Sequence, residues 1–200
     1  MTAILKVDTI QDTSGNNIIN ENANTITIGK SGDTVNLASG ATAGFGKVLQ
    51  VVSATKTDTQ AFSSSTFSDI TGLSVSITPS STSSKILVFG YAMVAWDVSF
   101  AKIGINLVRG STNILIGDAA GSRQRVSGFT YLGTACSGTF SLPVNFLDSP
   151  STTSATTYKI QASSIDNAGN VYINRSFTDT DNSTFARTAS TITAMEISIW

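Results

Sequence analysis

Histidine is absent from this 200-residue chain, and Cys136 is the only cysteine. Without histidine, neither a Ser-His-Asp triad nor a Cys-His pair can be built, and zinc loses its usual nitrogen ligand. One cysteine cannot form an intrachain disulfide, and we expect Cys136 to be a small buried apolar residue in a strand. No glycine-rich phosphate-binding motif is present. These absences predict a protein that is not an enzyme and holds no metal or cofactor.

Charge is also scarce, because Asp, Glu, Lys and Arg make up only 12% of the chain and the net charge is −1. Nucleic-acid binding requires a cationic surface, and no basic run occurs, so we expect no nucleic-acid partner. No stretch of 18 apolar residues predicts a transmembrane helix. The segment Met1–Ile10 lacks the cationic start and apolar run of a signal peptide, which predicts synthesis in a cytosol without membrane insertion.

Serine, threonine, asparagine and glycine are plentiful, whereas good helix formers such as Glu, Lys and Gln are sparse. Threonine, isoleucine and valine suit the pleated surface of a sheet, and serine, asparagine and glycine suit tight turns. The composition therefore predicts an all-β protein whose surface is made largely of hydroxyl and amide groups.

Residues 1–46 contain short groups of apolar residues separated by turn-forming clusters of Gly, Asn, Asp and Ser. The segment ends in a linker of small residues, 38–46. The spacing predicts short strands and tight turns. These apolar side chains are too few to offset the entropy of ordering the segment alone. We expect them to contact copies of the chain or a particle; a disordered leader is the alternative. The predicted contact residues are Ile4, Leu5, Val7, Ile10, Ile18, Ile19, Ile26 and Ile28.

Residues 47–200 predict a second domain of nine or ten short strands, a β-sandwich of jelly-roll type. Apolar and polar residues alternate strictly over Leu73–Ile77, as in a half-buried strand. Lys85–Trp96 is a long β-branched and aromatic run, which predicts one long or bent central strand. Further strands are predicted at 48–52, 103–107, 114–116, 129–132, 139–142, 144–147, 158–162, 171–173 and 192–199. The terminal Trp200 either covers its own core or lies near a subunit axis.

Two groups of polar residues are candidate ligand contacts. Arg123 and Arg125 could bind a small anion or an acidic sugar, or could lie at a solvated hairpin tip. Arg175, Phe177, Asp179, Asp181 and Arg187 could form a polar and aromatic surface of the kind that binds glycans; a solvated loop is the alternative. The string from Asp179 begins like a calcium loop but has Ser190 in place of the glutamate.

The strings Ile4–Asn17 and Thr25–Thr34 resemble the N-terminal region of phage tail-fibre and appendage proteins, especially those of marine and cyanobacterial phages. A second string, Phe146–Lys159, resembles part of their C-terminal β domains. The resemblance implies a homotrimer in the virion, assembled in the host bacterial cytoplasm. Its N-terminal segment (residues 1–46) would attach to another tail or capsid protein. Its outward knob (residues 47–200) would meet the host surface, where a cell-surface glycan is the candidate ligand.

A chain of this length leaves almost no shaft, so two further functions stay open. One is a head fibre or capsid decoration (cement) protein without a receptor role. The other is a spike that cleaves polysaccharide with paired carboxylates. The resemblance carries no catalytic or ligand residues, so none is assigned from it.

Overall fold

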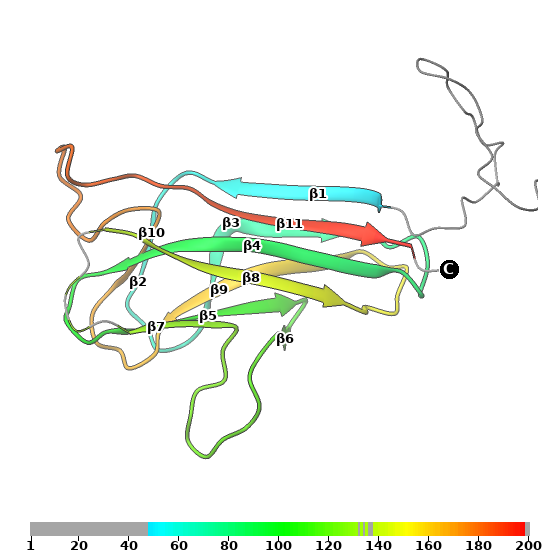
Figure 1. Ribbon diagram of the computed structural model, residues 1–200, viewed down its shortest axis with the longest axis horizontal. Coiled ribbons are helices and arrows are strands. Elements are labelled where there is room, and N and C mark those ends of the chain that lie inside the picture. Colours follow the sequence, from blue (N-terminus) through cyan, green and yellow to red (C-terminus); the bar gives the residue numbers. More distant parts are fainter. Residues whose placement is uncertain (1–47, 132, 134, 136–137, 199–200) are drawn as a thin grey trace, which may run out of the picture. The chain divides into compact units, whose positions relative to one another are not determined.

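The computed structural model describes residues 48–131, 133, 135 and 138–198 (Figure 1). They form strands and no helix, so none of the described residues belongs to a helix able to cross a membrane. The strands are β1 (Val48–Lys56), β2 (Gln60–Phe62), β3 (Ser68–Ile77), β4 (Lys85–Trp96), β5 (Lys102–Arg109), β6 (Thr112–Ile114), β7 (Gly128–Tyr131), β8 (Phe140–Asp148), β9 (Thr156–Ser164), β10 (Val171–Ile173) and β11 (Ser190–Ile197).

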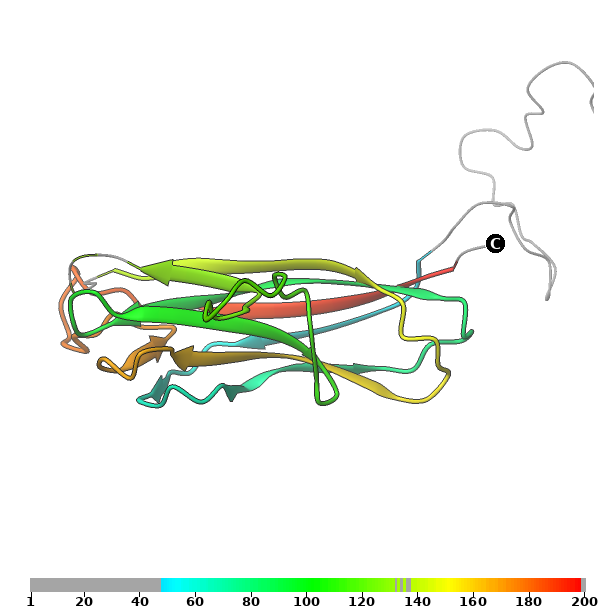
Figure 2. The same ribbon diagram turned by 90° about the horizontal axis from the view of Figure 1, so that it is seen from below.

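The strands form two antiparallel sheets that pack as a sandwich, seen from two directions in Figures 1 and 2. One sheet has the order β1-β11-β4-β10-β2, with β8 on the other side of β4. The second has the order β3-β9-β5-β6, with β7 also paired to β5. The neighbours β1-β11-β4-β8 and β3-β9-β5-β7 reproduce the alternating strand order of a jelly roll. The predicted all-β sandwich of jelly-roll type is therefore confirmed.

Period-two alternation places one side of most strands in the core. Along β11, buried and half-buried residues alternate without interruption, and Leu73, Val75 and Ile77 are the buried positions at the end of β3. The largest fully buried side chains include Trp96 at the end of β4 and Tyr158 on β9. The core thus lies between the two sheets, as the alternation predicts.

The predicted central strand Lys85–Trp96 is confirmed with the same bounds, and it pairs along both edges. The two strands predicted at 139–142 and 144–147 are wrong in number, because β8 runs unbroken through Pro143. Pro143 lacks a backbone N–H, but within the part of the chain that the structure describes β8 pairs with β4 alone and leaves its other edge unpaired. An edge strand tolerates proline for this reason.

The strand predicted at 114–116 is also wrong, since β6 occupies Thr112–Ile114 and Leu115 has a positive φ of 56° that ends it. On β5, every residue from Ile103 to Val108 is buried, so this strand does not alternate between buried and exposed residues. The chain covers its outer side: Phe67 and Ile165 lie so close to Gly104 that a Cβ there would contact both.

The predicted contact residues Ile4, Leu5, Val7, Ile10, Ile18, Ile19, Ile26 and Ile28 lie outside the described residues, and so do Cys136 and Trp200. The boundary between residues 1–46 and 47–200 stays a prediction.

Candidate functional site

The two ends of the sandwich differ in what they carry. We call the end with Val48, where β1 begins, and Ile197, where β11 ends, the proximal end. The opposite, distal end carries the connection from β10 to β11 (residues 174–189), which Figure 1 shows in orange on the left. The connections 97–101 and 165–170 also lie there. The distal end is therefore built from loops, and the candidate site lies among them.

The base of the 174–189 connection is held by Asn174, which is buried and has a positive φ of 62°. Its Nδ2 donates to the backbone oxygens of Lys56 (2.8 Å) and Asp58 (3.0 Å), and its Oδ1 accepts from Ser190 Oγ (2.6 Å). The Thr188 N–H donates to the Asn174 backbone oxygen (3.0 Å). Asparagine tolerates a positive φ better than most residues. Asn174 therefore fixes both ends of the connection, through its side chain and its backbone oxygen.

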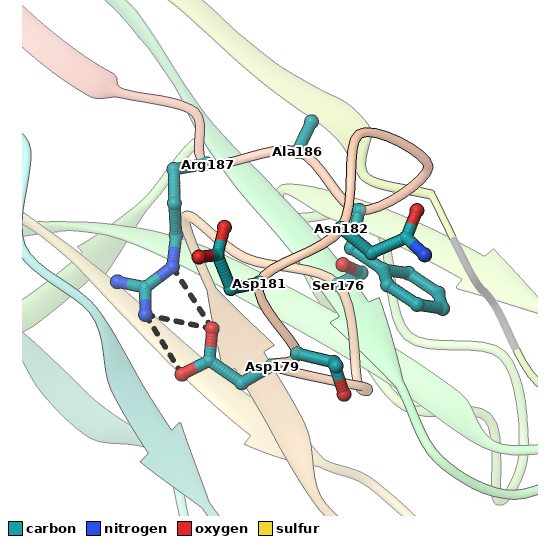
Figure 3. Close-up of a pocket in the computed structure, with 8 residues that line it drawn as sticks. Ser176, Asp179, Asp181, Asn182, Ala186 and Arg187 are labelled. Atoms are coloured by element: carbon teal, nitrogen blue, oxygen red, sulfur yellow. Dashed lines mark hydrogen bonds and ion pairs between the residues drawn. The ribbon is translucent and has the colours of Figure 1, made fainter.

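The connection encloses an open pocket of about 320 Å³ (Figure 3). Arg187 crosses one side of it: its Nε and Nη2 donate to the two carboxylate oxygens of Asp179 at 2.9 and 2.8 Å. Paired donation of this kind orients a guanidinium rigidly. The lining residues are Ser176, Asp179, Thr180, Asp181, Asn182, Phe185, Ala186 and Arg187.

The pocket offers several kinds of contact to a ligand. The Asp181 side chain is exposed and makes no hydrogen bond or ion pair with the described residues, so its carboxylate can accept hydrogen bonds from hydroxyl groups. Phe185 supplies an aromatic ring to the lining of the pocket. A sugar has an apolar face, which can pack against an aromatic ring, and hydroxyl groups at its edge, which can donate to a carboxylate.

Of the five residues predicted in this region, Asp179, Asp181 and Arg187 line the pocket, and Arg175 and Phe177 do not. The Arg175 guanidinium lies 4.0 Å from the centroid of the Tyr172 ring. It donates to the backbone oxygens of Ser176 (3.3 Å) and Phe177 (3.1 Å). Arg175 therefore supports the loop that carries the pocket.

Arg123 and Arg125 lie elsewhere, in the connection from β6 to β7, which is a long excursion and not a hairpin tip. Arg123 lines a separate hollow of about 360 Å³ with Lys102, Phe129 and Ile165. The Arg125 Nε donates to the Gly117 oxygen at 2.6 Å. The two arginines are exposed but do not join the pocket.

The sequence did not predict the exposed aromatic side chains at the distal end. Phe100 is 58% exposed and Tyr131 is 47% exposed, and their ring centroids are 6.1 Å apart. Phe140 is 42% exposed and lies 5.4 Å from the Trp96 ring. Phe100 has a positive φ of 65° and is flanked by small residues, a context that could have marked it as a loop residue.

The Asp97 carboxylate, which follows β4 at the distal end, is held by hydrogen bonds within the fold. Asp97 accepts hydrogen bonds from the Asn170 backbone N–H (2.8 Å), Asn170 Nδ2 (2.7 Å) and the Tyr172 hydroxyl (2.8 Å). Burial raises the pKa of Asp97, but these hydrogen bonds outweigh it and lower the pKa below its ordinary value. No group of three or more Asp, Glu, Cys or His placed to hold a metal occurs among the described residues.

No family model matches the sequence, and no curated protein matches it. Two solved structures of infectious bursal disease virus align with this chain. The Gt strain structure aligns with a TM-score of 0.36 and 14% identity, and the Gx strain structure with a TM-score of 0.38 and 12% identity. Each alignment covers 82% of this chain and 44% of the viral chain, so this chain spans less than half the length of either. A likeness at this level assigns neither a family nor a function.

Proposed function

We propose that this chain is a structural protein of a bacteriophage particle, a homotrimeric tail-fibre or appendage subunit whose knob contacts the host surface. Residues 1–46 attach it to another tail or capsid protein, and the jelly roll presents its distal loops outward. The role is binding and not catalysis. The resemblance of Ile4–Asn17 and Thr25–Thr34 to phage fibre proteins is the starting point.

The observation that carries the proposal is the polarity of the domain. The N-terminal segment joins the described domain at Val48, at the proximal end, whereas the pocket and the exposed aromatic rings lie at the distal end. A domain tethered at one end presents its other end to a target. Exposed aromatic rings beside polar loops are typical of binding surfaces.

A glycan of the host surface is the ligand class that fits the pocket. Asp181 and Asn182 provide acceptors and donors for hydroxyl groups, and Phe185 provides a ring against which a sugar face can pack. The Arg187–Asp179 pair is internally neutral and Asp181 adds a negative charge to the lining, so the pocket favours a neutral sugar over an acidic one.

Locating the protein on intact particles tests the structural role. Particles labelled with gold-conjugated antibody against residues 48–198 should carry a few labels at the tail in electron micrographs. Labels spread over the head would replace the tail-fibre proposal with the head-fibre or decoration alternative. Purified particles without any label would overturn a virion role.

Binding of the full chain to an array of bacterial surface polysaccharides tests the pocket. Asp181→Ala and Phe185→Ala should each weaken binding about tenfold, because a charged hydrogen bond and an aromatic contact each contribute roughly 1 to 2 kcal/mol. Asp118→Ala, at another exposed acid, is the matched control. Equal binding by all three variants would remove the pocket from the proposal, and new reducing ends would indicate a cleaving spike.

A further inference from the structure

The outer surface of the six-stranded sheet carries an ordered apolar row. Figure 1 shows β1, β11, β4 and β8 side by side, and their register places Val51, Met195, Leu87 and Leu147 in line across all four strands. The alternate residues of these strands, such as Ile86, Ile192 and Val144, are buried in the core. The row therefore points away from the core.

Two more rows lie beside the first. The second consists of Ser53, Thr193, Phe89 and Asn145, and the third of Thr55, Thr191, Tyr91 and Pro143. We call these twelve residues the four-strand face. None of them is charged, and Val51 (52% exposed), Phe89 (40%) and Leu147 (53%) are large apolar residues open to solvent. Lys85 lies at its proximal margin, where its Nζ donates to Ser149 Oγ at 2.6 Å.

The outer surface of the other sheet differs because it carries charged residues and is partly covered by the chain itself. It carries an ion pair between Lys159 and Asp69 at 2.8 Å. The chain itself also covers part of it, because Ser163 Oγ donates to the Ser65 oxygen and Phe67 lies over Gly104. No described segment covers the four-strand face in this way. The uncharged face is therefore the distinctive surface of the domain.

We propose that the four-strand face packs against other copies of this chain and forms the contact between knobs. This rests on the homotrimer of the proposed function and specifies which surface makes it. A second copy brings the same uncharged side chains, so no charge loses its water without a partner when the faces meet. A partner with an ordinary charged surface would leave charges unpaired against Val51, Leu87 and Leu147.

The size of the face fits this partner. Strand spacing and rise give its four strands a width of about 19 Å and its three rows a length of about 20 Å, on the order of 400 Å². Three copies that each bury this face would remove about 1,200 Å² from water in total, which is the scale of a small specific interface. The face thus combines an apolar row with two rows that carry hydroxyl, amide and aromatic groups, and specific interfaces contain both kinds of surface.

Thiol accessibility in the full chain tests the proposal at the face itself. In a Cys136→Ser background, Asn145→Cys places one thiol in the four-strand face, and Ser76→Cys places one on an exposed position of β3 in the other sheet. Light scattering first gives the oligomeric state. In the trimer, a charged thiol reagent should modify the thiol at position 145 at least tenfold more slowly than the thiol at position 76.

A double substitution in the four-strand face, with a matched control substitution outside it, tests the contact between copies directly. Val51→Lys with Leu147→Lys should remove the protection at position 145, whereas Phe129→Lys, at an equally exposed ring on β7, should not. Circular dichroism checks that each variant is folded. A trimer in which both thiols react at equal rates overturns the face assignment and leaves the proposed function standing. A monomeric wild-type chain overturns both, and leaves the face to a different protein.

Discussion

At the residue scale, Asp148 is a buried carboxylate that joins the two sheets. Its oxygens accept from Arg109 Nη1 (2.8 Å) and from the Tyr158 hydroxyl (2.6 Å). Burial and this hydrogen bond raise the pKa of Tyr158 above its ordinary value. The hydroxyl therefore acts as a permanent donor to Asp148.

Tyr158→Phe removes that donor and should lower the free energy of unfolding by about 1.5 to 3 kcal/mol, because the acceptor is a buried charged group. Urea denaturation at neutral pH measures the loss. Tyr131→Phe, at a ring that is 47% exposed, is the matched control and should change stability by less than about 0.5 kcal/mol. Equal effects of the two substitutions would contradict this role of Asp148.

Glu196 is a buried carboxylate at the proximal end, bound by Gln50 Nε2 (2.6 Å) and by the N–H and Oγ of Ser80 (2.7 Å each). Burial raises the pKa of Glu196, but the hydrogen bonds from Gln50, Ser80 and Ser84 outweigh it and lower the pKa to about 2. The pKa of the folded state thus lies below the ordinary value of 4.5.

The ionised carboxylate therefore stabilises the fold above pH 4.5, and this stabilisation is lost as the pH falls toward 2. Between these values, the wild-type chain should lose stability more steeply than Glu196→Gln. Guanidinium denaturation midpoints at several pH values measure the difference. Parallel curves for the two proteins would show that Glu196 does not carry this dependence.

At the element scale, the pairing of β4 with β11 depends on Gly90. A Cβ at this position would collide with the Thr191 backbone oxygen and lie 2.8 Å from the Ile192 Cα. Both atoms belong to the backbone of the neighbouring strand, so they cannot move without displacing β11. The glycine permits the close approach of the two strands.

Gly90→Ala should lower the free energy of unfolding by about 1 to 3 kcal/mol, as overpacking does in other cores. Gly117→Ala is the control, because no atom lies within 4 Å of a Cβ built there and its φ is not positive. Thermal unfolding of both variants measures the effect. A Gly90→Ala protein as stable as wild type would show that β4 and β11 can separate at little cost.

At the scale of the whole molecule, the jelly roll has its own core within the described residues. A domain of this size buries enough apolar surface to fold independently. Deletion of residues 1–46 should therefore leave the thermal midpoint and the β-type circular dichroism spectrum unchanged. It should also abolish attachment to the particle, measured by co-sedimentation with particles that lack the protein. Retained attachment would assign the particle contact to the knob.

The sequence by itself determined the strand class and much of the core. Strict alternation over Leu73–Ile77 predicted which side chains are buried, because successive residues of a strand point to opposite sides. The run Lys85–Trp96 was predicted as one strand for its β-branched and aromatic content. Of the residues grouped in one candidate surface, Asp179, Asp181 and Arg187 line the same pocket, since they lie close together in the chain.

Only the tertiary structure decided which strands are neighbours. Pro143 stays within β8 because that strand lies at an edge, and β5 is buried on both sides because Phe67 and Ile165 fold over it. Phe185 joins the pocket through the path of its loop, and Val51 meets Leu147 through two intervening strands. Each outcome depends on contacts between residues far apart in the chain. Local periodicity carries no information about such pairings, so the uncharged four-strand face emerges only when the strands are assembled.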